Sequence, residues 1–192
     1  MTRYTCCDEL RRNAVDAHAT LNGIDYLEVL DHDAPLNSPR QRTLLLHLLK
    51  VPSAALTLNQ VRLDGGERVR NIRIEWIGLA DSTLVNATPA EQTYLSSLPH
   101  AERILVIRTD NHGDYSTYRL VLQRAPEDPR PPLNFDPRLS AIDFSFKVEC
   151  PTDFDCKLAR YCDEPAAIGP DINYLAKDYA SFRRLILDRL SV

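Results

Sequence analysis

Three cysteines near the carboxyl end of the chain come nearest to a metal-binding pattern. Cys150, Cys156 and Cys162 are spaced six and six residues apart. Thiolates bind zinc and iron–sulfur clusters well, but structural zinc sites use about four ligands, mostly in pairs separated by about two to four residues. Here each intervening loop has five residues, and a fourth ligand would have to come from Cys6, Cys7 or a distant histidine. We therefore expect buried or free thiols, or one adventitious disulfide among them, and no bound metal, with these three cysteines as the weak candidate ligands.

Two acidic stretches could also do chemistry. Asp31, His32 and Asp33 place an imidazole between two carboxylates, an arrangement that hydrolases and metal sites use. The stretch lies beside Pro35, however, and aspartate is a common turn residue. Residues 110–114 are similar to a calcium-binding loop but lack the distal glutamate, so we interpret them as a hairpin turn between two strands.

No other motif in the sequence predicts catalysis or a cofactor. Residues 64–66 form an Asp-Gly-Gly turn, and neither the Lys-Ser/Thr pair nor the helix of a phosphate-binding loop follows it. A nucleophile-elbow motif and a zinc-protease motif are both missing from the chain. We therefore expect a protein without enzymatic activity, without catalytic residues and without a cofactor.

Composition excludes several classes of partner. The formal net charge is −4 at pH 7, and the sequence pI is near 5.7, so the chain has no general attraction to nucleic acid or to anionic membranes. No apolar run approaches the ~20 residues that span a bilayer, and the first residues lack an apolar signal core. Arg68, Arg70 and Arg73 cluster, but we interpret them as a solvated strand face or the rim of a protein interface rather than a polyanion site.

The elements that position these residues are mostly strands. Apolar residues alternate with polar ones over the stretches 42–49, 70–76, 115–122 and 142–148, and shorter strands are expected at 26–30, 61–63 and 103–109. Residues 64–67 are predicted to close a hairpin. A short helix is expected at 8–19 and one helical turn within 90–98. Strands separated by turns, without crossover helices, predict a mainly β fold: an antiparallel β-sandwich of immunoglobulin or fibronectin type.

The alternation also predicts which side chains fill the sandwich. The strand at 42–49 has apolar residues on both faces, so it is expected to be buried on both sides. The predicted core consists of Leu44, Leu46, Leu48, Ile72, Ile74, Trp76, Val106, Leu120, Phe144 and Phe146.

The last residues of the chain predict a docking helix. Its apolar residues recur at gaps of three and four, which is the spacing of a heptad seam. The seam consists of Ile172, Leu175, Tyr179, Phe182 and Ile186, with Leu190 widening it. The helix reaches the chain end without a stop signal, so we expect it to pack on a helix that this chain lacks. The predicted organisation is an arm with a helix at 1–22, the sandwich at 23–149, a Cys/Pro-rich linker at 150–170 and the docking helix at 171–192.

Several of these segments also carry a family resemblance. Residues 172–183, together with residues 22–30, 40–45, 142–151 and 153–156, resemble in the same order the amino-terminal region of baseplate assembly proteins from contractile, phage-tail-like injection systems. Members of that family are longer, so the chain is expected to be the amino-terminal part of such a protein or a split version of it. The resemblance covers residues 12–190.

The resemblance implies a structural role. It implies a component of the baseplate wedge whose partners are other wedge subunits, further copies of itself and the baseplate proteins that initiate sheath and tube, with no nucleic acid and no membrane insertion. It also implies production in the cytoplasm and incorporation into a particle. The alternative is a β-sandwich module that binds carbohydrate or another ligand through its loops, which the scarcity of loop aromatics does not favour.

Overall fold

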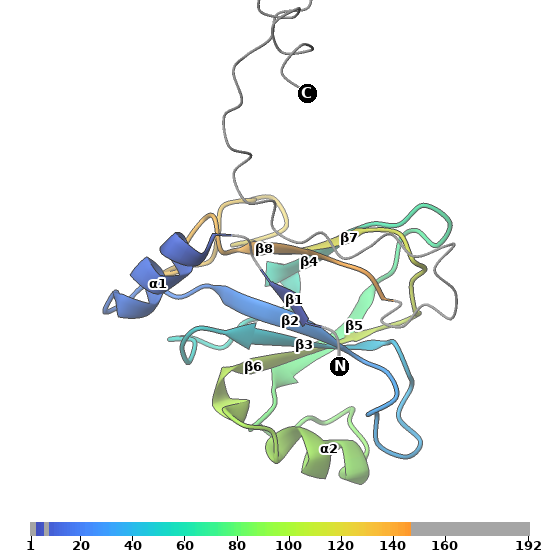
Figure 1. Cartoon of the computed structure of the whole chain (residues 1–192). Helices are drawn as coiled ribbons and strands as arrows, with labels where there is room; N and C mark the ends of the chain where they lie inside the picture. Colours follow the sequence, from blue (N-terminus) through green and yellow to red (C-terminus); the bar gives the residue numbers. More distant parts are fainter. Residues whose placement is uncertain (1–2, 6–7, 147–192) are drawn as a thin grey trace, which may run out of the picture. The chain divides into compact units, whose positions relative to one another are not determined.

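Two antiparallel sheets face each other in the computed structural model, which describes residues 3–5 and 8–146 (Figure 1). The five-stranded sheet has the order β1-β2-β3-β6-β5 and the three-stranded sheet the order β4-β7-β8. The strands of the larger sheet are β1 (Arg3–Thr5), β2 (Ile24–Leu30), β3 (Thr43–Leu48), β6 (Ile104–Thr109) and β5 (Ile74–Leu79). Those of the smaller sheet are β4 (Val61–Gly65), β7 (Tyr118–Leu122) and β8 (Ala141–Phe144). The predicted mainly β sandwich is therefore confirmed.

The main hydrophobic core lies between the two sheets. Alternate residues of each strand point into it, as the pleat of a strand requires. Seven of the ten predicted core residues are buried here: Leu44, Leu46, Leu48, Ile72, Leu120, Phe144 and Phe146. Ile74 packs against this core while partly exposed. Edge-on contacts between the rings of Tyr118 and Phe146, whose centroids are 4.8 Å apart, help to close the core beside β8.

Trp76 and Val106 were predicted in this core, and that prediction was wrong. A β-bulge between Ile74 and Trp76 shifts the register of β5, and one extra residue turns every later side chain to the opposite face. Ile77 therefore takes the inner position, and Trp76 packs in a second apolar cluster on the outer face of the larger sheet. Val106 belongs to that second cluster as well, because it alternates with the inward Leu105 and Ile107 of β6.

The two predicted hairpins are also corrected. β4 pairs with β7 and β5 pairs with β6, so residues 64–67 begin a crossing from one sheet to the other. Residues 110–114 likewise connect β6 of the larger sheet with β7 of the smaller one. A short turn-rich segment can close a hairpin or pass between two stacked sheets, and local residue types do not distinguish these outcomes.

Two α-helices flank the sandwich. α1 (Glu9–Ala17) begins at Asp8, whose carboxylate accepts the Arg11 amide as an N-cap, and α2 (Pro89–Ser96) lies on the outer face of the five-stranded sheet (Figure 1). Two 3₁₀ turns, η1 (Leu58–Gln60) and η2 (Ala101–Arg103), precede β4 and β6. The sequence did not predict β1, which pairs with β2. The predicted cysteine cluster, linker and docking helix lie outside the described residues.

Candidate docking surface

α2 covers one half of the outer face of the five-stranded sheet. Leu45, Ile104 and Val106 point out of the sheet on this side and pack with Leu95 of α2 in the second apolar cluster. The helix starts at a capping box, in which Thr88 and Glu91 satisfy each other's backbone amides, and Pro89 occupies its first turn. The double-sided burial expected for the strand at 42–49 is thus explained, because this helix covers the outer side of β3.

The only charged residue of α2 is directed inward. The Glu91 carboxylate forms an ion pair with the Arg108 guanidinium, and the two side chains are only 3% and 7% exposed. The Arg108 guanidinium carbon also lies 5.1 Å from the centre of the Trp76 ring. Burial by itself raises the pKa of Glu91, but the hydrogen bonds from the Thr88 amide and the Arg108 guanidinium outweigh it and hold the pKa below its usual value. The charge of the helix is therefore neutralised within the fold.

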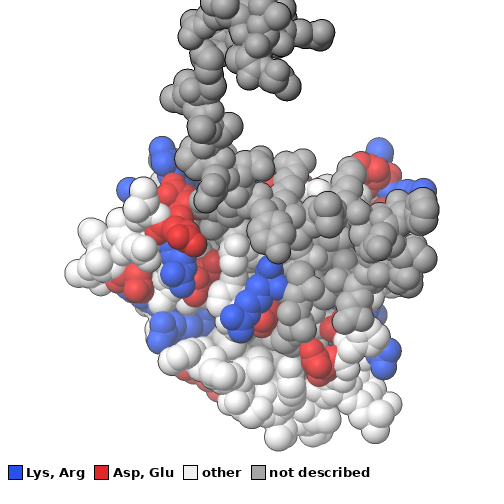
Figure 2. Space-filling model, in the orientation of Figure 1, with Lys and Arg blue, Asp and Glu red and all other residues white. Residues whose placement is uncertain are grey.

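The helix and the residues on either side of it expose no charged side chain of their own. From residue 82 to residue 100 the chain contains no Asp, Glu, Lys or Arg except the buried Glu91, although charged residues make up 26% of the whole sequence. We call residues 82–100 the α2 cap. Figure 2 shows this region as a nearly white area in the lower part of the view. Val85 is 91% exposed within it. Depletion of charged side chains is typical of the central part of protein interfaces.

A compact polar cluster occupies the half of the sheet's outer face next to β1. Glu28 accepts a hydrogen bond from Arg3 Nε at 2.9 Å and contacts His47 Nε2 at 3.1 Å. The Tyr26 ring stacks on His47 with centroids 4.0 Å apart, and the Arg3 guanidinium carbon lies 4.8 Å from the Tyr26 ring. Burial tends to raise the pKa of Glu28, yet the contacts with His47 and Arg3 lower it. Sequence reasoning missed this cluster, since its members meet only through the pairing of β1, β2 and β3.

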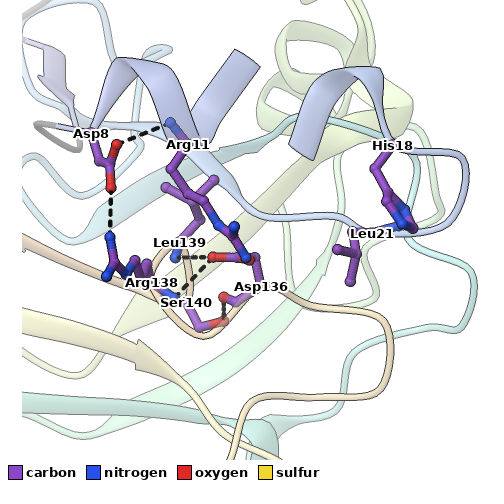
Figure 3. Close-up of polar contacts among 8 residues, drawn as sticks. All are labelled: Asp8, Arg11, His18, Leu21, Asp136, Arg138, Leu139 and Ser140. Atoms are coloured by element: carbon purple, nitrogen blue, oxygen red, sulfur yellow. Dashed lines mark hydrogen bonds and ion pairs between the residues drawn. The ribbon is translucent and has the colours of Figure 1, made fainter. Parts of the chain in front are cut away.

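The region around α1 is charged, in contrast to the α2 cap (Figure 3). Asp136 is fully buried and accepts hydrogen bonds from the Arg11 guanidinium and from the amides of Arg138 and Leu139. Arg138 in turn reaches the Asp8 carboxylate. These contacts attach α1 to the loop before β8, so the cluster is structural.

The Lys50 side chain and a small apolar cluster hold the carboxyl-terminal end of α1. The Lys50 ammonium donates to the carbonyl oxygens of Val15, His18 and Leu21, where the helix ends. Val15 packs with Leu49 and Leu139 beneath the helix. The helix is thereby held at both ends.

The acidic stretches behave as turns in the structure. Asp31 accepts a hydrogen bond from the Gln41 side chain at 2.8 Å, and its carbonyl accepts the Ala34 amide. Asp114 accepts the amides of Arg68 and Val69, so its carboxylate supports the crossing segment between β4 and β5. Within residues 3–5 and 8–146 no three His, Cys, Asp or Glu side chains are grouped to hold a metal ion.

The remaining predicted site residues are placed as follows. Arg68, Arg70 and Arg73 are exposed. Among the large aromatic side chains of the described residues, only Tyr115 is exposed, at 38%, which offers little for sugar stacking. Cys150, Cys156 and Cys162, and the docking-helix residues Ile172, Leu175, Tyr179, Phe182, Ile186 and Leu190, lie outside the described residues. No helix in the described part of the chain is long and apolar enough to cross a membrane.

The described residues thus combine a β-sandwich with an uncharged helical cap. Residues 1–144 match the family model described as the phage baseplate assembly protein, N-terminal domain. Because the match covers most of the chain, the protein belongs to this family, and the predicted resemblance is confirmed. No curated protein and no protein of solved structure is detectably similar to the chain. Family membership indicates a structural role in a phage-type baseplate.

Proposed function

We propose that the chain is a non-catalytic subunit of the baseplate wedge in a contractile, phage-tail-like injection system. Its proposed partners are other wedge subunits, further copies of itself and the baseplate proteins on which sheath and tube begin. It is made in the cytoplasm and then incorporated into the particle. Membership of the baseplate assembly family supports the general role. The α2 cap is the observation on this structure that supports a protein–protein contact.

The arrangement around Glu91 explains why the cap suits a protein partner. Burying an unpaired charge in an interface costs far more than burying an uncharged polar side chain, and burying an apolar side chain is favourable. α2 keeps its one carboxylate paired with Arg108 beneath the helix, so a partner meets only uncharged groups. Covering a fully exposed valine such as Val85 contributes about 1.5–3 kcal/mol before the costs of association. We assign the cap to contact with a neighbouring wedge subunit.

A charge-insertion experiment tests this assignment. The variant Val85→Asp with Thr93→Lys places two charges on exposed positions of the α2 cap without altering the net charge. The matched control, Leu10→Asp with Asn13→Lys, does the same on the exposed side of α1, where Leu10 is 85% exposed. Each protein is co-expressed with the baseplate proteins encoded beside it, and the assembled complex is isolated and quantified.

The cap variant should lose assembly while its melting temperature stays that of the parent protein, because exposed substitutions usually change stability by less than about 0.5 kcal/mol. The α1 control should assemble normally. Normal assembly of the cap variant would contradict the assignment of the cap, and loss of assembly in both variants would show that the effect is not specific to it.

The predicted helix at residues 171–192 remains a proposal from its sequence. We propose that Ile172, Leu175, Tyr179, Phe182, Ile186 and Leu190 form the seam that docks on another subunit or on a further part of the same protein. The variant Phe182→Asp with Ile186→Asp should abolish assembly without lowering the melting temperature of the isolated chain. A lower melting temperature with normal assembly would show instead that the helix completes its own domain.

A further inference from the structure

β5 is an edge strand whose outward backbone groups can be identified. It pairs with β6 on one side, and it is the last strand in the order of its sheet. The Ala80 amide donates to the Ile104 carbonyl at 2.9 Å. After the bulge, the backbone N–H and C=O groups of the even-numbered residues of β5 therefore point toward β6. Because backbone groups alternate sides along a strand, the N–H and C=O of Ile77 and the N–H of Leu79 point away from the sheet.

These groups have no hydrogen-bond partner among the described residues. The Leu79 carbonyl is occupied, since it accepts the Ser82 amide at 3.0 Å and the Ser82 hydroxyl at 2.6 Å. Within residues 3–5 and 8–146, no group bonds to the outward N–H and C=O of Ile77 or to the Leu79 amide. A donor, an acceptor and a second donor thus remain in a row along the edge, which is the pattern that an added strand would satisfy.

The other sheet edges carry features that discourage strand addition. β1 is three residues long and includes Arg3, β8 is four residues long and includes Asp143, and β4 carries Arg62 and Asp64. Charged residues and short length are the usual protection of exposed edges. β5 has no proline, lysine or arginine and a single charge, at Glu75. Its bulge disturbs only the beginning of the strand, before Ile77.

We propose that β5 pairs antiparallel with β5 of a second copy of this chain, joining the two five-stranded sheets into one. If the two-fold axis that relates the two copies passes through the Ile77 pair, the backbone N–H and C=O groups of the two Ile77 residues form two hydrogen bonds with each other. This axis places Trp76 opposite the second copy's Gly78 and Glu75 opposite its Leu79. An axis one residue later would bring Glu75 opposite the acidic Asp81, so like charges disfavour it. The inference rests on the proposed function and deepens it, because it places the proposed contact between copies of this chain on the β5 edge.

One observation and one general principle favour a second copy as the occupant. The half of β5 from Trp76 to Leu79 is uncharged, so two copies meet without repulsion. A two-fold pair of identical edges is self-complementary by symmetry, and two-fold dimers are the commonest oligomers.

A proline substitution separates strand addition from folding. Ile77→Pro removes an amide that points outward and leaves the ladder with β6 intact. Leu63→Pro is the matched control: the Gln123 amide donates to the Gln60 carbonyl, so the Leu63 amide also points outward, from the edge strand β4 of the smaller sheet. Both side chains are partly buried against the same core. The mass in solution is measured by light scattering for the purified full chain, whose monomer mass is 21.8 kDa.

The parent chain and Leu63→Pro should have twice the monomer mass, and Ile77→Pro should have the monomer mass. A monomeric parent chain, or an Ile77→Pro variant that remains a dimer, would overturn the proposal. Amide hydrogen exchange of the parent chain gives a second test that does not depend on the folding of any variant. The Ile77 and Leu79 amides should exchange slowly, and faster on dilution.

The exchange pattern also separates the other occupants. Slow exchange at every concentration in a monomer would show that another segment of the same chain pairs with β5. Slow exchange that appears only when other baseplate proteins are added would show that a different subunit supplies the strand. Either result would overturn pairing between two copies.

Discussion

The two helices are held on the same sandwich in opposite ways. α1 is attached through charges: Arg11 contacts the buried Asp136, Arg12 contacts Asp25, and Lys50 caps its last carbonyls. α2 is attached through an apolar cluster around Leu95, and its only charge is hidden in a pair with Arg108. The outward surface of α1 is therefore rich in charge and that of the α2 cap has none.

The comparison teaches that the contribution of an ion pair to stability depends on how deeply its two side chains are buried. The Arg11 side chain is 43% exposed and can return to water if its partner is lost. The Arg108 side chain is 7% exposed and cannot. An uncompensated buried charge is among the most costly defects in a folded protein, whereas an exposed one is nearly neutral. Because Glu91 points inward, mutations of the Glu91–Arg108 pair are expected to weaken the packing of α2 on the sheet. The outer surface of α2 stays uncharged and suited to a partner.

The largest effect is expected from Glu91→Ala. It leaves Arg108 buried without a counter-charge and should lower the free energy of unfolding by about 3–5 kcal/mol. Urea denaturation can be followed by the fluorescence of Trp76, the single tryptophan, which lies beside Arg108. The double variant Glu91→Leu with Arg108→Met should recover most of the loss. If the double variant is as unstable as Glu91→Ala, the unpaired charge is not the cause.

Asp136→Ala should cost less, about 2–3 kcal/mol. The change removes a buried acceptor of two amides and a guanidinium, and hydrogen bonds to charged groups contribute about 1.5–3 kcal/mol. Arg11 can regain water, which limits the loss. Arg12→Met on the same helix breaks only the more exposed pair with Asp25 and should cost about 0–1 kcal/mol. Equal losses in Asp136→Ala and Glu91→Ala would show that the exposure of the remaining arginine is not decisive.

Lys50→Met should have a smaller and local effect, about 1 kcal/mol, because a cation at a helix carboxyl end contributes in that range. The variant removes the donor to the carbonyls of Val15, His18 and Leu21. Amide exchange should accelerate in the last turn of α1 and stay unchanged in α2. Faster exchange in both helices would mean that the two attachments are coupled.

The smallest expected effect is the change in stability with pH. The folded pKa of Glu91 lies below its ordinary value of 4.5, so its stabilising contribution is complete above that value and is lost as the pH falls toward the folded pKa. The pKa of Asp136 is likewise lowered from its ordinary value of 3.8, so its contribution to stability is also lost as the pH falls. The difference in melting temperature between the parent and Glu91→Gln should shrink as the pH decreases below about 4.5. The change is small because protonation only begins there. A growing difference would contradict the assigned direction.

Alternation along single strands predicted much of the main core. Ile142, Phe144 and Phe146 point one way because a pleated strand alternates its side chains, whatever lies beside it. The burial of β3 on both faces was visible for the same reason. Trp76 was misplaced because a bulge adds one residue to a strand without a signal in residue type.

The candidate docking surface was not predicted from the sequence. The absence of charge between residues 82 and 100 is visible in the sequence, but its meaning depends on where Glu91 points. Glu91 meets Arg108, Arg11 meets Asp136, and Glu28 meets both Arg3 and His47 only after strands distant in sequence have paired. These pairs have no common spacing that a sequence pattern could reveal.

By itself the sequence determined the fold class, the two-sided burial of β3 and the inward residues of β7 and β8, since these follow from local periodicity and residue type. The family was indicated by the resemblance of several segments taken in order. Only the tertiary structure decided that β4 pairs with β7, that β5 is an edge and that α2 hides its charge. The physical reason is that strands pair through backbone groups that nearly every residue shares. The choice of neighbour is therefore made by the packing of the whole sandwich.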